Sequence, residues 1–206
     1  MIHDLTANVQ RCLDRLGRGD DAARKELLEV ACERLIRLTR VMLRDYRRLK
    51  RWEETDDVCQ TALIRLSRAL EVTTPANPRD FYRLATLQIR RELIDLARRH
   101  FGPEGQGANH ATNDSGGDPE GGTRPAYERA DSADGPTQLA AWREFHERVE
   151  ALPEEEKEVF DLVWYQGLQH TQAAELLGVS ARTVKRRWQA ACLRLHELLG
   201  GELPGM

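Results

Sequence analysis

The stretch of sequence that decides the fold is HTQAAELLGVSARTVKRRW, from His170 to Trp188. Two short helix-forming segments flank a glycine, which is the layout of a helix-turn-helix. Ala174 is small where the two helices would cross, and Gly178 supplies the left-handed turn residue. Thr171 and Ser180 are placed to cap the two helices.

The second helix of this motif has two contrasting faces. At about 100° of rotation per residue, one narrow stripe is apolar and is predicted to face the core. Its members are Val184, Trp188, Ala191, Leu195 and Leu198. The other side suits insertion into a major groove, where Arg can grip guanine and Lys or Arg can neutralise phosphate. The residues expected to contact DNA are Ser180, Arg182, Thr183, Lys185, Arg186, Arg187 and Gln189.

A basic face can also serve only to solvate a surface helix. Residues 170–195, however, hold five basic residues and one acidic residue within an otherwise acidic region. Together with the turn geometry, this local charge favours contact with DNA.

The rest of the chain also predicts helices, because long stretches of Leu, Ala, Arg and Glu show no sustained alternation. The fold class is therefore all-α. The expected helices are Leu5–Leu16, Asp21–Leu49, Asp56–Leu70, Arg79–Phe101, Leu139–Ala151, Glu154–Tyr165, Thr171–Leu177 and Ala181–Leu199.

Residues 102–137 divide these helices into two groups. They contain 8 of the 15 glycines and almost no apolar side chains, so they predict a flexible, solvated linker. A long functional loop inside one domain is the alternative. The domain expectation is a helical unit at 1–101, a flexible acidic linker at 102–137 and a helix-turn-helix unit at 138–206.

Composition excludes several classes of protein. The 206 residues carry a net charge of -3, and the four cysteines stand alone, which predicts free thiols in a reducing cytoplasm and no metal or disulfide framework. No apolar run reaches membrane-span length and no signal-peptide layout is present, so we expect a cytoplasmic protein without a membrane partner. Six scattered histidines, with no phosphate loop or nucleophile elbow, argue against an enzyme. We expect no catalytic residues, metal, cofactor or small-molecule substrate.

The helix from Asn77 to His100 is the most basic part of a basic N-terminal region, in which residues 1–101 hold 21 Lys and Arg against 16 Asp and Glu. One stripe of this helix is apolar, and a second arc of about 100° forms a cationic ridge. The apolar stripe is Tyr82, Ala85, Ile89, Leu93 and Leu96, and the ridge is Arg83, Arg90, Arg91 and Arg98. Neutralising phosphate is the strongest use for such arginines, although a solvated face is the plainer alternative.

Several motifs resemble sigma factors. The Leu152–Pro153 start, the acidic helix that follows, the Gly167–Leu168 break and Ala-Glu-Leu-Leu-Gly-Val-Ser from residue 174 look like region 4, which reads the minus-35 element in that family. The same half-motif is also similar to the DNA-binding domain of response-regulator activators, so the N-terminal region has to discriminate.

The N-terminal region resembles sigma regions 2.3 to 2.4, including Ile94–Asp95 followed by two arginines. That region contacts the minus-10 element, and the loop Val72–Pro78 corresponds to the segment that captures a flipped base. The resemblance implies minus-10 contacts at Asn77, Arg83, Arg90, Arg91, Arg98 and Arg99. Arg91 stands where many relatives have Asn, which leaves the preferred base open.

The helix that begins near Asp56 resembles the segment of extracytoplasmic-function (ECF) sigma factors that docks on the clamp helices of RNA polymerase. The resemblance implies polymerase contacts at Asp56, Asp57, Gln60, Thr61 and Arg65. Thr61 departs from the Glu that is common there, and an acidic helix start also serves as a cap.

Both regions together predict an ECF sigma factor of the sigma-70 family, similar to the planctomycete-type members. Expected partners are RNA polymerase core, through its clamp helices and flap, promoter DNA, and an anti-sigma factor as a further candidate. The alternative function is a helix-turn-helix transcriptional regulator with a helical sensing domain.

Overall fold

The computed structural model describes residues 3–42, 51–101 and 134–201, and every regular element in these ranges is helical. The elements are α1 (His3–Leu16), α2 (Asp21–Met42), α3 (Arg51–Val72), α4 (Pro78–Phe101), α7 (Asp134–Glu150), α8 (Glu154–Phe160), the π-helix η2 (Asp161–Tyr165), α9 (His170–Leu177) and α10 (Ala181–Leu198). The all-α prediction is confirmed. Most of the predicted linker lies outside the described residues, and α7 begins at Asp134, inside the range assigned to it.

Local side-chain chemistry determines where the helices begin. Asn77 caps α4, because its Oδ1 accepts a hydrogen bond from the Asp80 backbone N–H at 3.0 Å and its Nδ2 donates to the Asp80 carboxylate at 2.9 Å. Pro78 occupies the first helical position, where a missing N–H costs nothing. Asp20 does the same for α2, since its carboxylate accepts from the Ala22 N–H at 2.9 Å.

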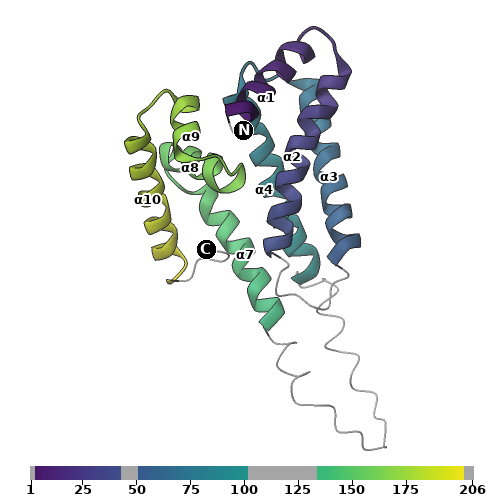
Figure 1. Cartoon of the computed structure of the whole chain (residues 1–206). Coiled ribbons are helices and arrows are strands. Elements are labelled where there is room, and N and C mark those ends of the chain that lie inside the picture. The colour runs from purple at the N-terminus through teal and green to yellow at the C-terminus, as the bar shows by residue number, and fades with distance from the viewer. Residues whose placement is uncertain (1–2, 43–50, 102–133, 202–206) are drawn as a thin grey trace, which may run out of the picture.

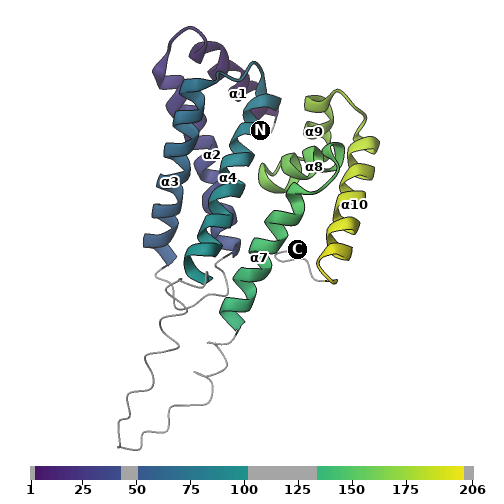
Figure 2. The same cartoon turned by 180° about the vertical axis from the view of Figure 1, so that it is seen from behind.

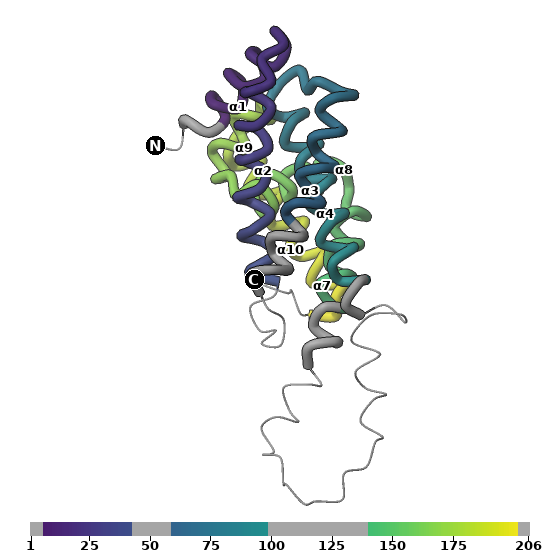
Figure 3. The backbone as a smooth tube through the Cα atoms, turned by 90° about the vertical axis from the view of Figure 1, so that its right-hand side faces the viewer, coloured from purple at the N-terminus to yellow at the C-terminus, as the bar shows by residue number. Residues whose placement is uncertain are grey.

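The helices form two units that face each other (Figure 1). We call α1–α4 the N-terminal bundle, in which α2, α3 and α4 run side by side while α1 crosses one end. We call α7–α10 the C-terminal unit, in which α7 lies next to α4 and α10 lies on the far side (Figures 1 and 2). Seen from the side, the bundle stands in front of the C-terminal unit (Figure 3). The contact between the units therefore runs along α4.

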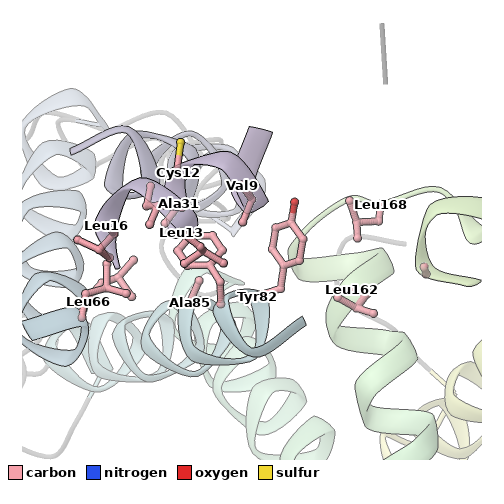
Figure 4. Packing of buried hydrophobic residues seen from close by; sticks show 14 of the residues in the cluster. Val9, Cys12, Leu13, Leu16, Ala31, Leu66, Tyr82, Ala85, Leu162 and Leu168 are labelled. Carbon is pink, nitrogen blue, oxygen red and sulfur yellow. The ribbon is translucent and has the colours of Figure 1, made fainter. Parts of the chain in front are cut away.

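Apolar packing continues across this contact. One buried cluster joins Ile89 and Leu93 of α4 to Phe145 of α7 and Phe160 of α8. A second cluster joins α1–α4 to η2 and the helix-turn-helix. Tyr82 lies at the edge of this second cluster that faces Leu162 and Leu168 of the C-terminal unit (Figure 4).

The predicted core faces are largely confirmed. The whole apolar stripe of α4 is buried: Tyr82, Ala85, Ile89, Leu93 and Leu96. On α10 the members fully buried are Val184, Ala191 and Leu195.

The rest of the α10 stripe differs from the prediction. Trp188 is half-buried and stacks on Phe160, with ring centroids 5.2 Å apart. Leu198 is wrong as a core residue, since it is 42% exposed. The helix ends there, and the next residue, Leu199, packs against the core instead.

Phe160→Ala should lower the free energy of unfolding by about 3–5 kcal/mol, because the fully buried Phe160 ring packs against Phe145, Trp164 and Trp188 and its loss leaves a cavity. Urea unfolding followed by circular dichroism measures this change. Leu193→Ala is the control, since Leu193 is 61% exposed and should change stability by about 0.5 kcal/mol or less. Equal losses for the two variants would contradict the core assignment.

Candidate nucleic-acid interface

The basic face of α10 is open to solvent. Ser180 caps this helix as predicted, its hydroxyl accepting a hydrogen bond from the Thr183 backbone N–H at 3.1 Å. The two hydroxyl groups also lie 2.9 Å apart. The residues predicted to enter a groove are all exposed, namely Arg182, Lys185, Arg186 and Gln189. The apolar stripe thus anchors α10 on one side and leaves the other side free for a DNA groove.

The turn before α10 has the predicted left-handed glycine. Gly178 has a φ of 64°, and the Val179 N–H donates to the Ala174 carbonyl at 3.0 Å, which closes α9 as a glycine C-cap does. The predicted cap at Thr171 is wrong. Gln169 caps α9 instead, in a reciprocal capping box with Gln172, because the helix begins at His170.

Arg187 differs from the other basic residues of α10. Its guanidinium lies 2.6 Å from the Glu155 carboxylate and its side chain is only 17% exposed. Arg194, about two turns further along, pairs with Glu156 at 3.0 Å. These two pairs tie α10 to α8. The phosphate role predicted for Arg187 stays a prediction.

The predicted minus-10 residues occupy three kinds of position. Arg83, Arg91 and Arg98 are exposed on α4, as predicted. Asn77 is exposed and caps the helix. The Arg99 side chain lies outside the described residues.

Arg90 does not lie on an exposed ridge, and this corrects the sequence analysis. Its side chain is 4% exposed and forms ion pairs with Asp161 of η2 and Glu150 of α7. Its Nε donates to the Tyr165 hydroxyl at 3.3 Å, and its guanidinium carbon lies 4.9 Å from the centre of the Tyr165 ring. Helical rotation alone placed Arg90 among solvent-facing arginines, whereas α7 and η2 cover that part of α4.

The π-helix brings these partners together. In η2, the Gln166 N–H donates to the Asp161 carbonyl five residues earlier at 3.1 Å, the pattern of a π-helix. Asp161 and Tyr165, which lie four residues apart, both contact the same guanidinium. A π-helical turn at a polar contact is typical of functional sites.

Burial and charge act against each other at this cluster. Burial lowers the pKa of Arg90, but Tyr165, Asp161 and Glu150 raise it by more, so the net pKa is raised and the charge is retained. Burial raises the pKa of Asp161 to about 6, against the lowering effect of Arg90. For Glu150 the lowering effects of Arg90 and Lys157 outweigh burial, and its pKa is lowered. At neutral pH the cluster therefore holds a cation between two carboxylates.

His146 is buried beside this cluster. Its Nδ1 lies 2.7 Å from the Tyr165 hydroxyl, which accepts a hydrogen bond from Arg90 and can donate to the ring. Burial lowers the pKa of His146 to about 3, and the charge of Arg90 contributes in the same direction. The imidazole is therefore neutral under ordinary conditions.

The predicted polymerase-docking residues lie on α3. Gln60 is exposed, Thr61 is half-buried, and Arg65 pairs with Asp95 at 2.8 Å. Asp56 and Asp57 belong to the first part of α3, but their side chains lie outside the described residues.

Sequence reasoning missed the acidic partners of α4. Arg79 forms two hydrogen bonds to the Glu158 carboxylate, at 2.6 and 2.8 Å, and Arg83 lies 3.2 Å from Glu154. In the sequence, the glutamates of residues 154–158 indicate only an acidic helix. A signal was present, since acids recur at residues 147, 150, 154 and 158 with helical spacing.

Other kinds of site find little support in the described ranges. The four cysteines form no disulfide with one another, and each is buried or half-buried. The His, Cys, Asp and Glu residues described by the structure form no group of three that could hold a metal ion. No described helix combines the length and the apolar character needed to cross a lipid bilayer.

The chain matches a known protein family over a range that includes both basic helices. A family model described as ECF sigma factor matches residues 6–200, which include both α4 and α10. Among the curated proteins compared with the chain, none matches it.

Because His146 is buried in its neutral form, the free energy of unfolding should fall as the pH is lowered. The unfolded imidazole binds a proton near pH 6.5 but the folded one only near pH 3, so its contribution is complete above pH 6.5 and is lost as the pH falls toward 3. Between pH 7.5 and 5.0 this group should cost the wild type about 2 kcal/mol of unfolding free energy.

His146→Gln should lack this component, because Gln does not titrate. Urea unfolding of both proteins at the two pH values measures it, and effects of Asp161 cancel in the difference. His196→Gln is the matched control, since His196 is exposed and its removal should leave the pH dependence of the wild type. If His146→Gln kept that dependence too, the buried neutral imidazole would be ruled out as its source.

Proposed function

The chain belongs to the ECF sigma factors, and we propose that it reads minus-35 DNA with α10 and minus-10 DNA with α4. As a member of that family it is a transcription initiation factor and not an enzyme, and its partners are RNA polymerase core and promoter DNA. The specific DNA contacts are our proposal.

One observation carries the assignment of α10. Its buried stripe and its Ser180 cap hold the helix on α8 and α9, while Arg182, Lys185, Arg186 and Gln189 remain exposed on one side. Exposed Arg and Gln on the first turns of such a helix suit bidentate hydrogen bonds to base edges in the major groove.

The assignment of α4 rests on charge. Arg83, Arg91 and Arg98 are exposed on a helix whose opposite stripe is core, and exposed arginines on a helix face can neutralise DNA phosphates. Arg90 would join them only when the C-terminal unit moves away from α4. We assign residues 1–101 to minus-10 and polymerase binding and residues 138–206 to minus-35 binding, with 102–137 as the link.

Contact with polymerase is assigned to the outer part of α3. Exposed Gln60 and half-buried Arg65 support a polar docking surface there, together with Asp56, Asp57 and Thr61, facing the polymerase clamp helices. The C-terminal unit would contact the flap, and an anti-sigma protein is a further proposed partner. We propose accordingly that the protein acts in the cytoplasm with the polymerase.

Run-off transcription with purified RNA polymerase core tests the proposed function. Adding this chain should produce transcripts from its promoter, and the chain should co-purify with core in a pull-down. A chain that binds DNA but never core would point instead to a helix-turn-helix regulator with a helical sensing domain.

Arg186→Ala should weaken binding to minus-35 duplex DNA by about 1–3 kcal/mol if Arg186 reads a base. Gel-shift titration at fixed salt measures the loss. Arg194→Ala is the matched control on the same helix, because Arg194 pairs with Glu156 and is assigned no DNA contact. Equal affinities for Arg186→Ala and this control would remove Arg186 from the reading face.

A further inference from the structure

The arginines of α4 and the acids of the C-terminal unit form a ladder of ion pairs. Its pairs are Arg79–Glu158, Arg83–Glu154, Arg90–Glu150 and Arg98–Glu147. The arginine numbers rise while the glutamate numbers fall, so the two chain segments run antiparallel. Over its 19-residue span, about 28 Å of α4 is faced by negative charge.

The centre of this ladder is buried, whereas its ends are exposed. Arg90 is 4% exposed and is shared by Glu150, Asp161 and Tyr165, while Arg83 and Arg98 are 73% and 57% exposed. Exposed pairs are weak and are screened by salt. Arg90 is the least exposed arginine of the ladder and has the most partners, so we call it the clasp of the ladder.

Two further hydrogen bonds between the units lie beside the clasp. The buried Gln166 side chain donates to the Thr86 hydroxyl at 2.7 Å. Arg34 of α2 donates to the Tyr165 carbonyl at 3.1 Å, and its guanidinium fills the space where a Cβ of Gly167 would lie. A side chain at residue 167 would have to displace this guanidinium, and Gly167 also has a φ of 66°, a backbone conformation that favours glycine.

This geometry conflicts with simultaneous promoter reading. Elements centred at minus-10 and minus-35 are separated by about 85 Å of duplex at 3.4 Å per base pair. A compact chain of this length has a radius of gyration of only about 17 Å. With α7 packed along α4, α4 and α10 cannot reach both elements at once.

We propose that the described arrangement is a closed, inactive state in which the acids of α7 and α8 compete with DNA phosphates for the basic face of α4. The inference rests on the proposed minus-10 role of α4. A cavity of about 160 Å³ lies beside the ladder, lined by Arg79, Arg83, Glu154 and Glu158 among others. Opening of the contact would also separate the apolar side chains that the two units share.

The triple variant Glu147→Gln/Glu154→Gln/Glu158→Gln tests the competition, because it removes the three ladder acids that do not contact Arg90 and keeps their shape. The full chain is titrated against a fluorescein-labelled 20-nucleotide single-stranded DNA of mixed sequence, read by anisotropy. Its affinity should rise on the order of ten-fold. The control Glu144→Gln/Glu175→Gln/Glu197→Gln changes the net charge equally, and its affinity should rise far less.

Small-angle X-ray scattering tests the clasp directly. Asp161→Asn removes a charge that faces Arg90 and should give a larger radius of gyration than the wild type, as should the ladder triple variant. Asp14→Asn, on the exposed side of α1, should remain as compact as the wild type. If Asp161→Asn fails to fold, the triple variant still provides the measurement.

The outcomes separate the closed state from the proposed function. Unchanged scattering for the ladder variants, with DNA affinities equal to those of their controls, would overturn the closed state. The opened variants could bind the DNA tightly while neither they nor the wild type support run-off transcription. This result would support the closed state and contradict only the proposed function.

Discussion

A single buried charge determines how the two units of this protein meet. Arg90 cannot release its proton, and its side chain is 4% exposed, so carboxylates must accompany it into the interior. Asp161 and Glu150 do so from two different elements, and the π-helical winding of η2 adds the Tyr165 hydroxyl. Three other features occur at the same contact. His146 is neutral, Gly167 lies against Arg34, and α7 runs along α4.

The fold was largely predictable because its determinants are local. Periodic apolar residues place α4 and α10 and select their buried faces, and short-range chemistry at Ser180 and Gly178 defines the turn between α9 and α10. The exceptions lie where periodicity ends. Gln169, and not the nearby Thr171, caps α9. Leu198 is exposed because the helix terminates beside it. Neither outcome follows from rotation about a helix axis.

The candidate site was predictable only on the side that faces solvent. The exposed residues of α10 follow from its own amphipathicity, whereas the burial of Arg90 depends on partners 60 and 71 residues away. A helical wheel assigns the same exposure to Arg83 and Arg90, since nothing in α4 itself states which turn another helix covers. The recurring acids from residue 147 to 158 were the available clue, but their spacing has an equally good local explanation in helix stability.

The antiparallel ladder also changes how the chain behaves at a distance. Arginines that are matched by carboxylates project little positive field beyond a Debye length, and the whole chain carries a net charge of only -3. A genome presents on the order of a million or more non-specific sites, which sequester any protein with a free basic helix. With the arginines of α4 paired, non-specific DNA would be held mainly by the open basic face of α10 and not by both helices.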